Sequence, residues 1–224
     1  MPRLARFLPP NNVFHIMCRG NNGQTVFRDE QDYAVYLRLY VRFRAEHPFE
    51  LFHYSLMPSH VHQLIRTLPE SDYSNFMKRL NLSYFTYYRD KYGWNGHFWQ
   101  DRFKSKLISQ DDYLIQCGKY IELNAVRAGL VKEPNGWQWC SYKTYSEGKS
   151  NRLITLDPIY KSLGVTDQIR QAAYQKMILS EVFDFDNKSV AQGSEEFITK
   201  TKRRAKYHQK QSGTFHSYPE IRQK

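Results

Sequence analysis

Two histidines separated by a single residue, His60 and His62, have the spacing in this 224-residue chain that best suits chemistry. They stand in a largely apolar run, residues 56–65, which is typical of a buried strand. Side chains alternate between the faces of a strand, so both imidazoles point the same way, about 6–7 Å apart. Two imidazoles placed like this can bind one metal ion. The spacing alone also allows two unrelated polar residues on a half-exposed strand.

A second feature is a tyrosine on a helix predicted over residues 111–124. Tyr120 and Asn124 are four residues apart, so they share one face of that helix. If the helix crosses the sheet face that carries the histidines, Tyr120 comes close to the metal. Imidazole nitrogens together with an amide oxygen suit Mg²⁺ or Mn²⁺, although imidazole alone would also suit Zn²⁺.

These groups together would suit phosphate chemistry that passes through a covalent phosphotyrosine. A metal-polarised phosphate would be attacked by Tyr120, and the retained bond would allow the strand to be rejoined to a new end. A free tyrosine has a pKa near 10, so the phenol needs a nearby cation, which Lys119 or Lys104 could supply. The chain has 17 tyrosines, and the pattern leaves these alternatives open: Tyr84, Tyr87, Tyr88 and Tyr113.

The elements that must position these residues alternate in a recognisable order. Strands are predicted over residues 13–19, 49–57, 60–66 and 102–108, with helices over residues 29–46, after residues 71–72, and over residues 111–124. The order β-α-β-β-α-β-α predicts an α+β fold, a ferredoxin-like sandwich with an antiparallel sheet.

Composition points to a nucleic-acid partner. The formal net charge is +11 with a sequence pI near 9.5, and aromatic residues make up 16% of the chain. Cations that follow phosphates and rings that stack on bases are what a single-stranded nucleic-acid binder needs. Three widely spaced cysteines predict no disulfide framework, and no apolar run is long enough to span a membrane. We therefore expect a soluble, cytoplasmic protein.

Composition also changes near residue 146. We predict one domain over residues 1–146 and a helical extension over residues 147–224, which ends in a basic, disordered tail. DNA contacts are expected from basic and aromatic residues along the chain: Arg3, Arg6, Arg19, Trp99, Arg102, Lys104, Lys106, Arg127, Lys202, Arg203 and Arg204.

Three motifs occur in an order that resembles a known family. They are MPSHVH at residues 57–62, GHFWQDRFK at residues 96–104 and YIELNAVRAGLV at residues 120–131. Together they resemble the REP-associated tyrosine transposases, bacterial relatives of the single-tyrosine HUH transposases. The resemblance covers roughly residues 11–145.

The resemblance implies an HUH nuclease fold and assigns roles to individual residues. His60 and His62 match the metal pair, Tyr120 matches the nucleophile, and Asn124 falls where the superfamily places a third metal ligand. The implied substrate is single-stranded DNA beside a REP- or BIME-like hairpin, cleaved and rejoined through a 5′-phosphotyrosine. It also implies a bacterial, nucleoid-associated protein that acts as a monomer or a homodimer.

Two other functions fit the same layout. A non-catalytic single-stranded nucleic-acid binding module, like an RNA-recognition domain, would use the histidines for stacking or hydrogen bonding. A metallo-phosphodiesterase would use water in place of the tyrosine. Replacing Tyr120 by phenylalanine separates both from the strand transferase.

Overall fold

The computed structural model describes residues 6–108 and 111–188. The chain divides into two units, Met1–Ile178 and Leu179–Lys224, and only the last turns of one helix are described in the second. Among the described residues, no helix is both long and apolar enough to cross a membrane. The proposed boundary near residue 146 falls inside the first unit, and its value as a functional boundary stays a prediction.

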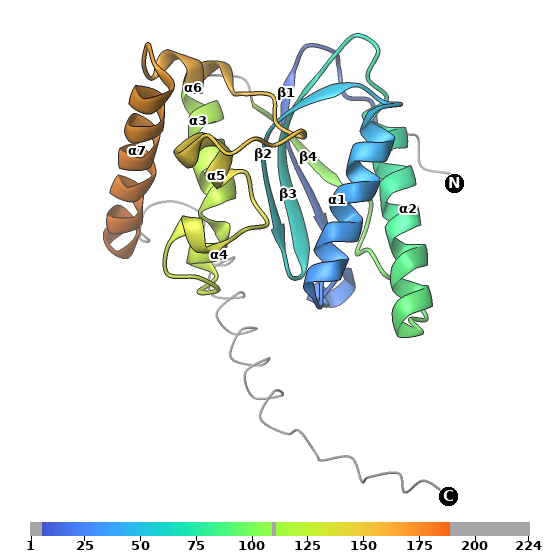
Figure 1. Ribbon diagram of the computed structural model, residues 1–224. Helices are drawn as coiled ribbons and strands as arrows, with labels where there is room; N and C mark the ends of the chain where they lie inside the picture. Colours follow the sequence, from blue (N-terminus) through green and yellow to red (C-terminus); the bar gives the residue numbers. More distant parts are fainter. Residues whose placement is uncertain (1–5, 109–110, 189–224) are drawn as a thin grey trace, which may run out of the picture. The chain divides into compact units, whose positions relative to one another are not determined.

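One four-stranded sheet forms the centre of the first unit (Figure 1). Its strands are β1 (Val13–Arg19), β2 (Phe49–Met57), β3 (His60–Thr67) and β4 (Lys104–Ile108). They lie in the order β2-β3-β1-β4, and every neighbouring pair is antiparallel. The ferredoxin-like prediction is therefore confirmed. The fourth strand was predicted to begin at Arg102 but begins at Lys104, so Arg102 precedes it.

Two helices cover one face of the sheet, α1 (Glu30–Arg44) and α2 (Tyr73–Tyr92) (Figure 1). Asp29 and Asp72 cap their N-termini, each accepting a hydrogen bond from a backbone N–H three residues later. Gly93 ends α2 in the left-handed conformation, with φ of 62°. The tyrosine and phenylalanine side chains of both helices pack with the buried side of the strands into the main core.

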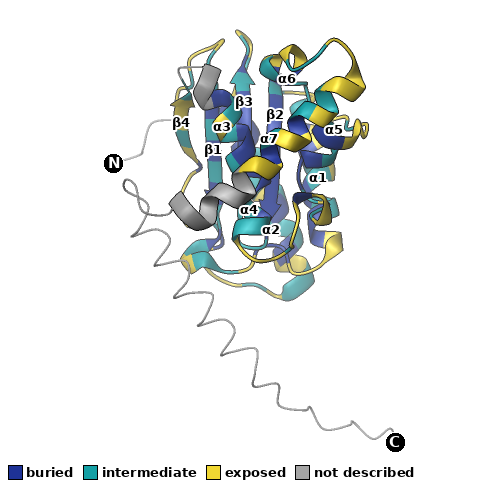
Figure 2. Ribbon diagram, turned by 90° about the vertical axis from the view of Figure 1, so that its left-hand side faces the viewer, coloured by how far each residue is buried: buried dark blue, intermediate teal, exposed yellow. Residues whose placement is uncertain are grey.

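The opposite face carries α3 (Asp111–Glu122) and α4 (Asn124–Arg127) (Figure 1). We predicted one helix to residue 124, but Leu123 separates two. Shorter elements follow: α5 (Tyr142–Glu147), α6 (Pro158–Ser162) and α7 (Asp167–Lys188), with 3₁₀ turns at Asn21–Gly23 and Pro134–Gly136. Helices on both faces explain why β2 and β3 are buried almost throughout (Figure 2).

The outer edge of β2 is covered by chain from beyond α4. Leu56 N–H donates to the Trp139 carbonyl over 2.9 Å, and Ser141 N–H donates to the Tyr54 carbonyl over 3.0 Å. Further along, Thr155 N–H donates to the Leu51 carbonyl over 2.9 Å. Trp139 also stacks on Tyr33 at 4.6 Å between ring centroids. Trp139 therefore packs against the core.

A buried polar cluster lies between β2, α3 and the residues that follow. His53 Nδ1 is 2.9 Å from Glu122 Oε1, and His53 Nε2 is 3.3 Å from Asp157 Oδ2. All three side chains are at most 2% exposed. Burial alone would lower the pKa of His53, but hydrogen bonds and charges from Asp157 and Glu122 raise it to about 9. His53 is therefore an imidazolium at neutral pH.

This imidazolium predicts how stability depends on pH. The folded pKa of His53 lies above its usual value of 6.5, so its contribution is complete below pH 6.5 and is lost as the pH rises towards 9. A shift of this size corresponds to about 3 kcal/mol of unfolding free energy. Urea denaturation at pH 6, 7.5 and 9 measures the loss. His53→Gln should flatten the profile, and identical slopes for both proteins would contradict the prediction.

Candidate active site

Cross-strand pairing places the histidine pair in the middle of one sheet face. His62 on β3 lies opposite Ser55 on β2 and Met17 on β1, and Met17 lies opposite Lys104 on β4. Directly paired residues of antiparallel strands point to the same face. One row across the sheet therefore carries an imidazole and, two strands away, an exposed lysine.

A third histidine, His15 on β1, belongs to the same group. Its Nε2 is 2.9 Å from His62 Nδ1, and the two rings stack with centroids 5.1 Å apart. The rings of His60 and His62 lie 4.9 Å apart, nearly perpendicular, and Ser59 Oγ is 3.0 Å from His60 Nδ1. In both His60 and His62, Nδ1 is thus engaged, which leaves Nε2 as the nitrogen that can bind a metal.

Burial keeps these imidazoles neutral. It lowers the pKa of His15 and of His60 to about 4, with smaller contributions from Lys106 and Arg19 respectively. Burial also holds the pKa of His62 well below its usual range, and His60 and His15 add to this effect. A neutral imidazole has a lone pair for a metal, so the protonation state of the group suits a cation ligand set.

Tyr120 lies against the histidines of its own chain. Its ring centroid is 5.7 Å from that of His62 and 6.0 Å from that of His15, both in edge-on contacts. The guanidinium carbon of Arg127 lies 4.8 Å from the centre of the tyrosine ring. Burial raises the pKa of Tyr120, whereas the charge of Arg127 acts to lower it. The cation that lies over the phenol ring is Arg127, a residue for which we predicted only DNA contact.

Asn124 is turned so that its amide oxygen is the atom left for a ligand. Its Nδ2 donates to the Tyr120 carbonyl over 2.9 Å and to the Ile121 carbonyl over 3.3 Å. Within the described residues, no three or more His, Cys, Asp or Glu side chains are grouped to hold a metal. The predicted set of two histidines and an amide needs no such group, and the ligand role of Asn124 stays a prediction.

The residues predicted to contact DNA occupy different places. Lys104 and Lys106 are exposed and share the face of the histidines, because their partners across β1 are Met17 and His15. Trp99 is half-buried and donates its indole N–H to the Asn81 carbonyl over 3.1 Å. Arg127 lies over the ring of Tyr120. The remaining residues divide as follows: Arg19 pairs with His60 across the strands, Arg6 bonds the Phe103 carbonyl, Arg102 is exposed, and Arg3, Lys202, Arg203 and Arg204 lie outside the described residues.

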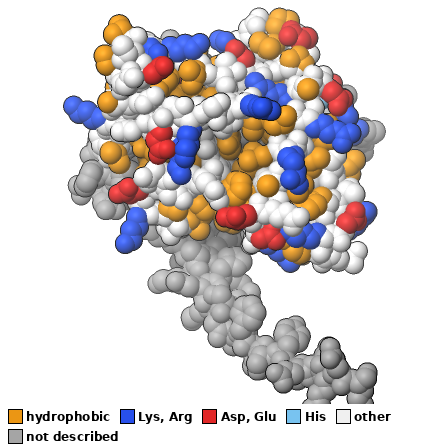
Figure 3. Space-filling model, viewed as in Figure 1, with side chains coloured by type: hydrophobic (Ala, Val, Ile, Leu, Met, Phe, Trp, Pro, Cys, Tyr) orange, Lys and Arg blue, Asp and Glu red, His pale blue; other side chains and the backbone are white. Residues whose placement is uncertain are grey.

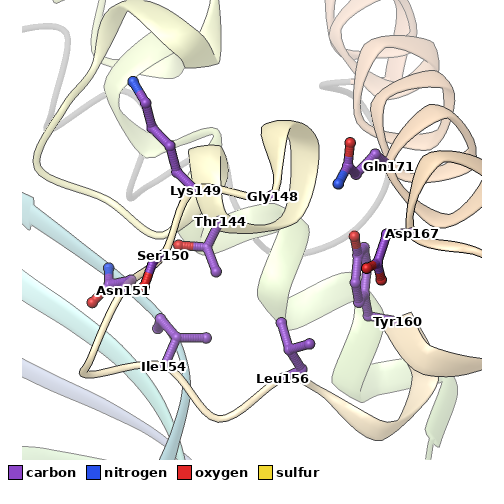
Figure 4. A pocket seen from close by; sticks show the side chains of 10 residues that line it. All are labelled: Thr144, Gly148, Lys149, Ser150, Asn151, Ile154, Leu156, Tyr160, Asp167 and Gln171. Atoms are coloured by element: carbon purple, nitrogen blue, oxygen red, sulfur yellow. The ribbon is translucent and has the colours of Figure 1, made fainter.

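Two other surface features give less support for a functional site. On the face drawn in Figure 3, described Lys and Arg side chains alternate with acidic and apolar ones. A pocket between α5 and the start of α7 is lined by residues that include Thr144, Tyr160 and Gln171 (Figure 4). Its lining contains none of the predicted site residues, so the histidine face remains the candidate active site.

A family model and a curated relative agree on one family. The family model described as "Transposase IS200 like" matches residues 10–124, slightly more than half of the chain. A protein of Haemophilus influenzae named as a REP-associated tyrosine transposase is 32% identical over 124 residues, covering 50% of this chain and 69% of that protein.

A solved structure has the same fold. It is titled as a REP-associated tyrosine transposase bound to a REP hairpin, and it matches with a TM-score of 0.55 and 20% identity over 70% of this chain and 93% of the other. At this identity the match supports the fold, while the family model and the Haemophilus relative support the family. The chain thus belongs to the IS200-like transposase family, as its three motifs predicted.

Proposed function

We propose that the chain is a metal-dependent endonuclease and strand transferase that acts on single-stranded DNA beside REP-type hairpins. The observation that carries the proposal is the placement of Tyr120 against His62 within one chain. The Haemophilus relative is named as a REP-associated tyrosine transposase, and the structural neighbour was solved with a REP hairpin. Both names fit a substrate of this class.

The residues on the histidine face suit a divalent metal, and the HUH family generally uses one. His60 and His62 would hold it through Nε2, and Asn124 would add its amide oxygen. Bound there, Mg²⁺ or Mn²⁺ would polarise the scissile phosphate and offset charge on the leaving oxygen. His15 would fix the tautomer of His62, because it can accept the Nδ1–H and leave Nε2 unprotonated.

Tyr120 would be the nucleophile in the cleavage step. Its phenol oxygen loses a proton to solvent and attacks the phosphorus, forming the bond to the 5′-phosphate as the bond to the 3′ oxygen breaks. Arg127 stabilises the phenolate through its charge over the ring. A 3′-hydroxyl of another strand end then attacks the same phosphorus, which releases Tyr120 and completes the transfer.

The arrangement also bears on the binding-module alternative. RNA-recognition domains bind bases on an open face of a four-stranded sheet. Here α1 and α2 cover one face and α3 covers much of the other (Figure 1). Bases would have to displace a helix to reach β2 and β3, which are buried almost throughout. This favours a site at the edge of α3 over a stacking platform.

The proposal is tested by trapping the covalent intermediate. The full chain is incubated with Mn²⁺ and a 3′-labelled hairpin that carries a single-stranded flank, and the products are separated on a denaturing gel. Label that migrates with the protein supports a tyrosine-linked 5′-phosphate. Free labelled fragments without an adduct would support hydrolysis by water, and intact DNA would support binding alone.

A further prediction concerns the salt dependence of binding. Lys104 and Lys106 are exposed beside the histidines and can contact phosphates. Replacing both by alanine should reduce the slope of log K against log salt by about 1.4, since each phosphate contact contributes roughly 0.7 for single strands. Fluorescence anisotropy with a labelled hairpin between about 50 and 200 mM salt measures the slope. Exposed Lys132 and Lys161 give the control pair, and equal slopes would argue against a phosphate track on β4.

A further inference from the structure

The buried end of α3 is held by residues from beyond the part that matches the transposase family model. Glu122 is the last residue of α3 and lies two positions after Tyr120. Residues two apart on a helix are rotated by about 200° around its axis, so their side chains point to nearly opposite sides. Tyr120 therefore faces the histidine pair while Glu122 leaves the helix on another side, towards β2.

Every hydrogen bond shown for the Glu122 carboxylate comes from outside its own helix. Oε1 accepts from Ser141 Oγ over 2.6 Å and lies 2.9 Å from His53 Nδ1, and Oε2 accepts from the Tyr174 hydroxyl over 2.6 Å. Glu122 is fully buried. Ser141 and Tyr174 follow residue 124, where the family match ends. The last turn of the tyrosine helix is thus bonded from the sheet, from the start of α5 and from α7.

His53 sets the distance between α3 and the sheet. A Cβ added at Gly118 would lie 2.8 Å from His53 Nε2, so this helix position tolerates no side chain without a shift. The imidazole stacks on Tyr145 at 4.4 Å, and Asp157 bonds its far nitrogen. Asp157 is itself fixed, because its Oδ1 caps α6 by accepting from the Ile159 N–H over 2.7 Å.

We propose that Ser141, Asp157 and Tyr174 form a clamp that positions Tyr120 against the histidine pair. This inference rests on the proposed function, since it concerns the placement of the nucleophile. Apolar side chains of similar volume would stabilise the packed helix by a similar free energy. Directional bonds to one carboxylate also fix the rotation and height of the helix. A misplacement of about 1 Å at a reacting group can cost on the order of 100-fold in rate.

The test compares two tyrosines of the same segment. Tyr174→Phe removes the hydroxyl that bonds Glu122, whereas Tyr160→Phe removes a buried hydroxyl that bonds the Tyr145 carbonyl over 2.9 Å. Both rings remain, and both residues are at most 4% exposed. The full-length variants are assayed for hairpin affinity, Mn²⁺ affinity, thermal stability and the single-turnover rate of adduct formation.

We expect Tyr174→Phe to form the adduct about tenfold more slowly with unchanged hairpin and Mn²⁺ affinities. Tyr160→Phe should stay within about twofold of the wild-type rate while losing a similar amount of stability. Gly118→Ala, which shifts α3 from the sheet side, should slow the adduct as well. Equal rates for Tyr174→Phe and Tyr160→Phe would overturn the clamp and leave the network a purely structural one.

A second measurement does not depend on activity. Hydrogen exchange of the peptide covering residues 114–124 should be faster in Tyr174→Phe than in Tyr160→Phe, because only the first variant frees the end of α3. If the wild-type chain forms no adduct at all, the proposed function fails, and this comparison still decides whether Tyr174 restrains the helix. Identical exchange in the two variants would overturn the inference.

Discussion

Tyr120→Phe should abolish the covalent protein–DNA adduct, by at least ~1,000-fold, while hairpin affinity stays within about twofold of wild type. The substitution keeps the ring, and so its contacts with His62 and Arg127, and removes only the attacking oxygen. The adduct is measured on a denaturing gel with Mn²⁺ and a 3′-labelled hairpin, and affinity is measured by anisotropy in parallel.

The matched control for this prediction comes from α2. The hydroxyls of Tyr84 and Tyr88 donate to the Val26 and Thr25 carbonyls, and that of Tyr87 donates to Asp32. Tyr84 and Tyr88 belong to the core on the other side of the sheet, and the partly buried Tyr87 packs against it. Tyr87→Phe should therefore leave the adduct intact. An adduct that persists in Tyr120→Phe would transfer the nucleophile to another residue and remove the main support for our mechanism.

His62→Ala should have the second-largest effect, a loss of at least ~100-fold in both Mn²⁺ affinity and adduct formation. The imidazole is 3% exposed and sits between His60 and His15. Its removal takes one of two nitrogen ligands and also leaves His15 without its bonding partner. Titration calorimetry with Mn²⁺ gives the affinity, and the gel assay gives the adduct.

A histidine remote from the sheet face gives the control. His47 follows α1, at the end of β2 away from the histidine pair. His47→Ala should change neither Mn²⁺ affinity nor adduct yield. His15→Gln is an intermediate case, in which we expect a 10- to 100-fold loss of metal affinity because the tautomer of His62 is no longer fixed. Unchanged Mn²⁺ binding by His62→Ala would show that the metal binds elsewhere.

The sequence predicted the first two strands well. β1 and β2 match the predicted residues 13–19 and 49–57, because apolar side chains with turn residues at both ends specify each strand locally. The start of β4 was missed by two residues, since the basic pattern continues through Arg102 while pairing with β1 begins at Lys104. Side-chain alternation alone does not show where a partner strand begins.

Parts of the site depend on tertiary contacts that no local pattern reveals. His15 resembled an ordinary strand residue, and only the register between β1 and β3 brings it to His62. An alternation signal was present, because His15 and Arg19 lie on one face of the first strand. Arg127 contacts the ring of Tyr120 from the end of α4, and this residue lies beyond the helix predicted over residues 111–124.

The sequence did not predict the proposed clamp, for a related reason. His53 lies 69 residues from Glu122 and 104 residues from Asp157 along the chain. A lone histidine within an apolar strand is usually a satisfied core residue, and its two carboxylate partners have no sequence motif. Charged residues whose partners lie so far away carry almost no signal in a single sequence.

The covered edge of β2 has a practical consequence for any shortened version of this protein. A chain ending at residue 124 would lose the partners of Leu56, Tyr54 and Leu51, and one ending at residue 146 would still lose the partner of Leu51. An exposed, apolar strand edge with unpaired amides and carbonyls is a template for intermolecular strand addition. Truncation to the family-matched region should therefore yield aggregates, even though His60, His62, Tyr120 and Asn124 are all retained.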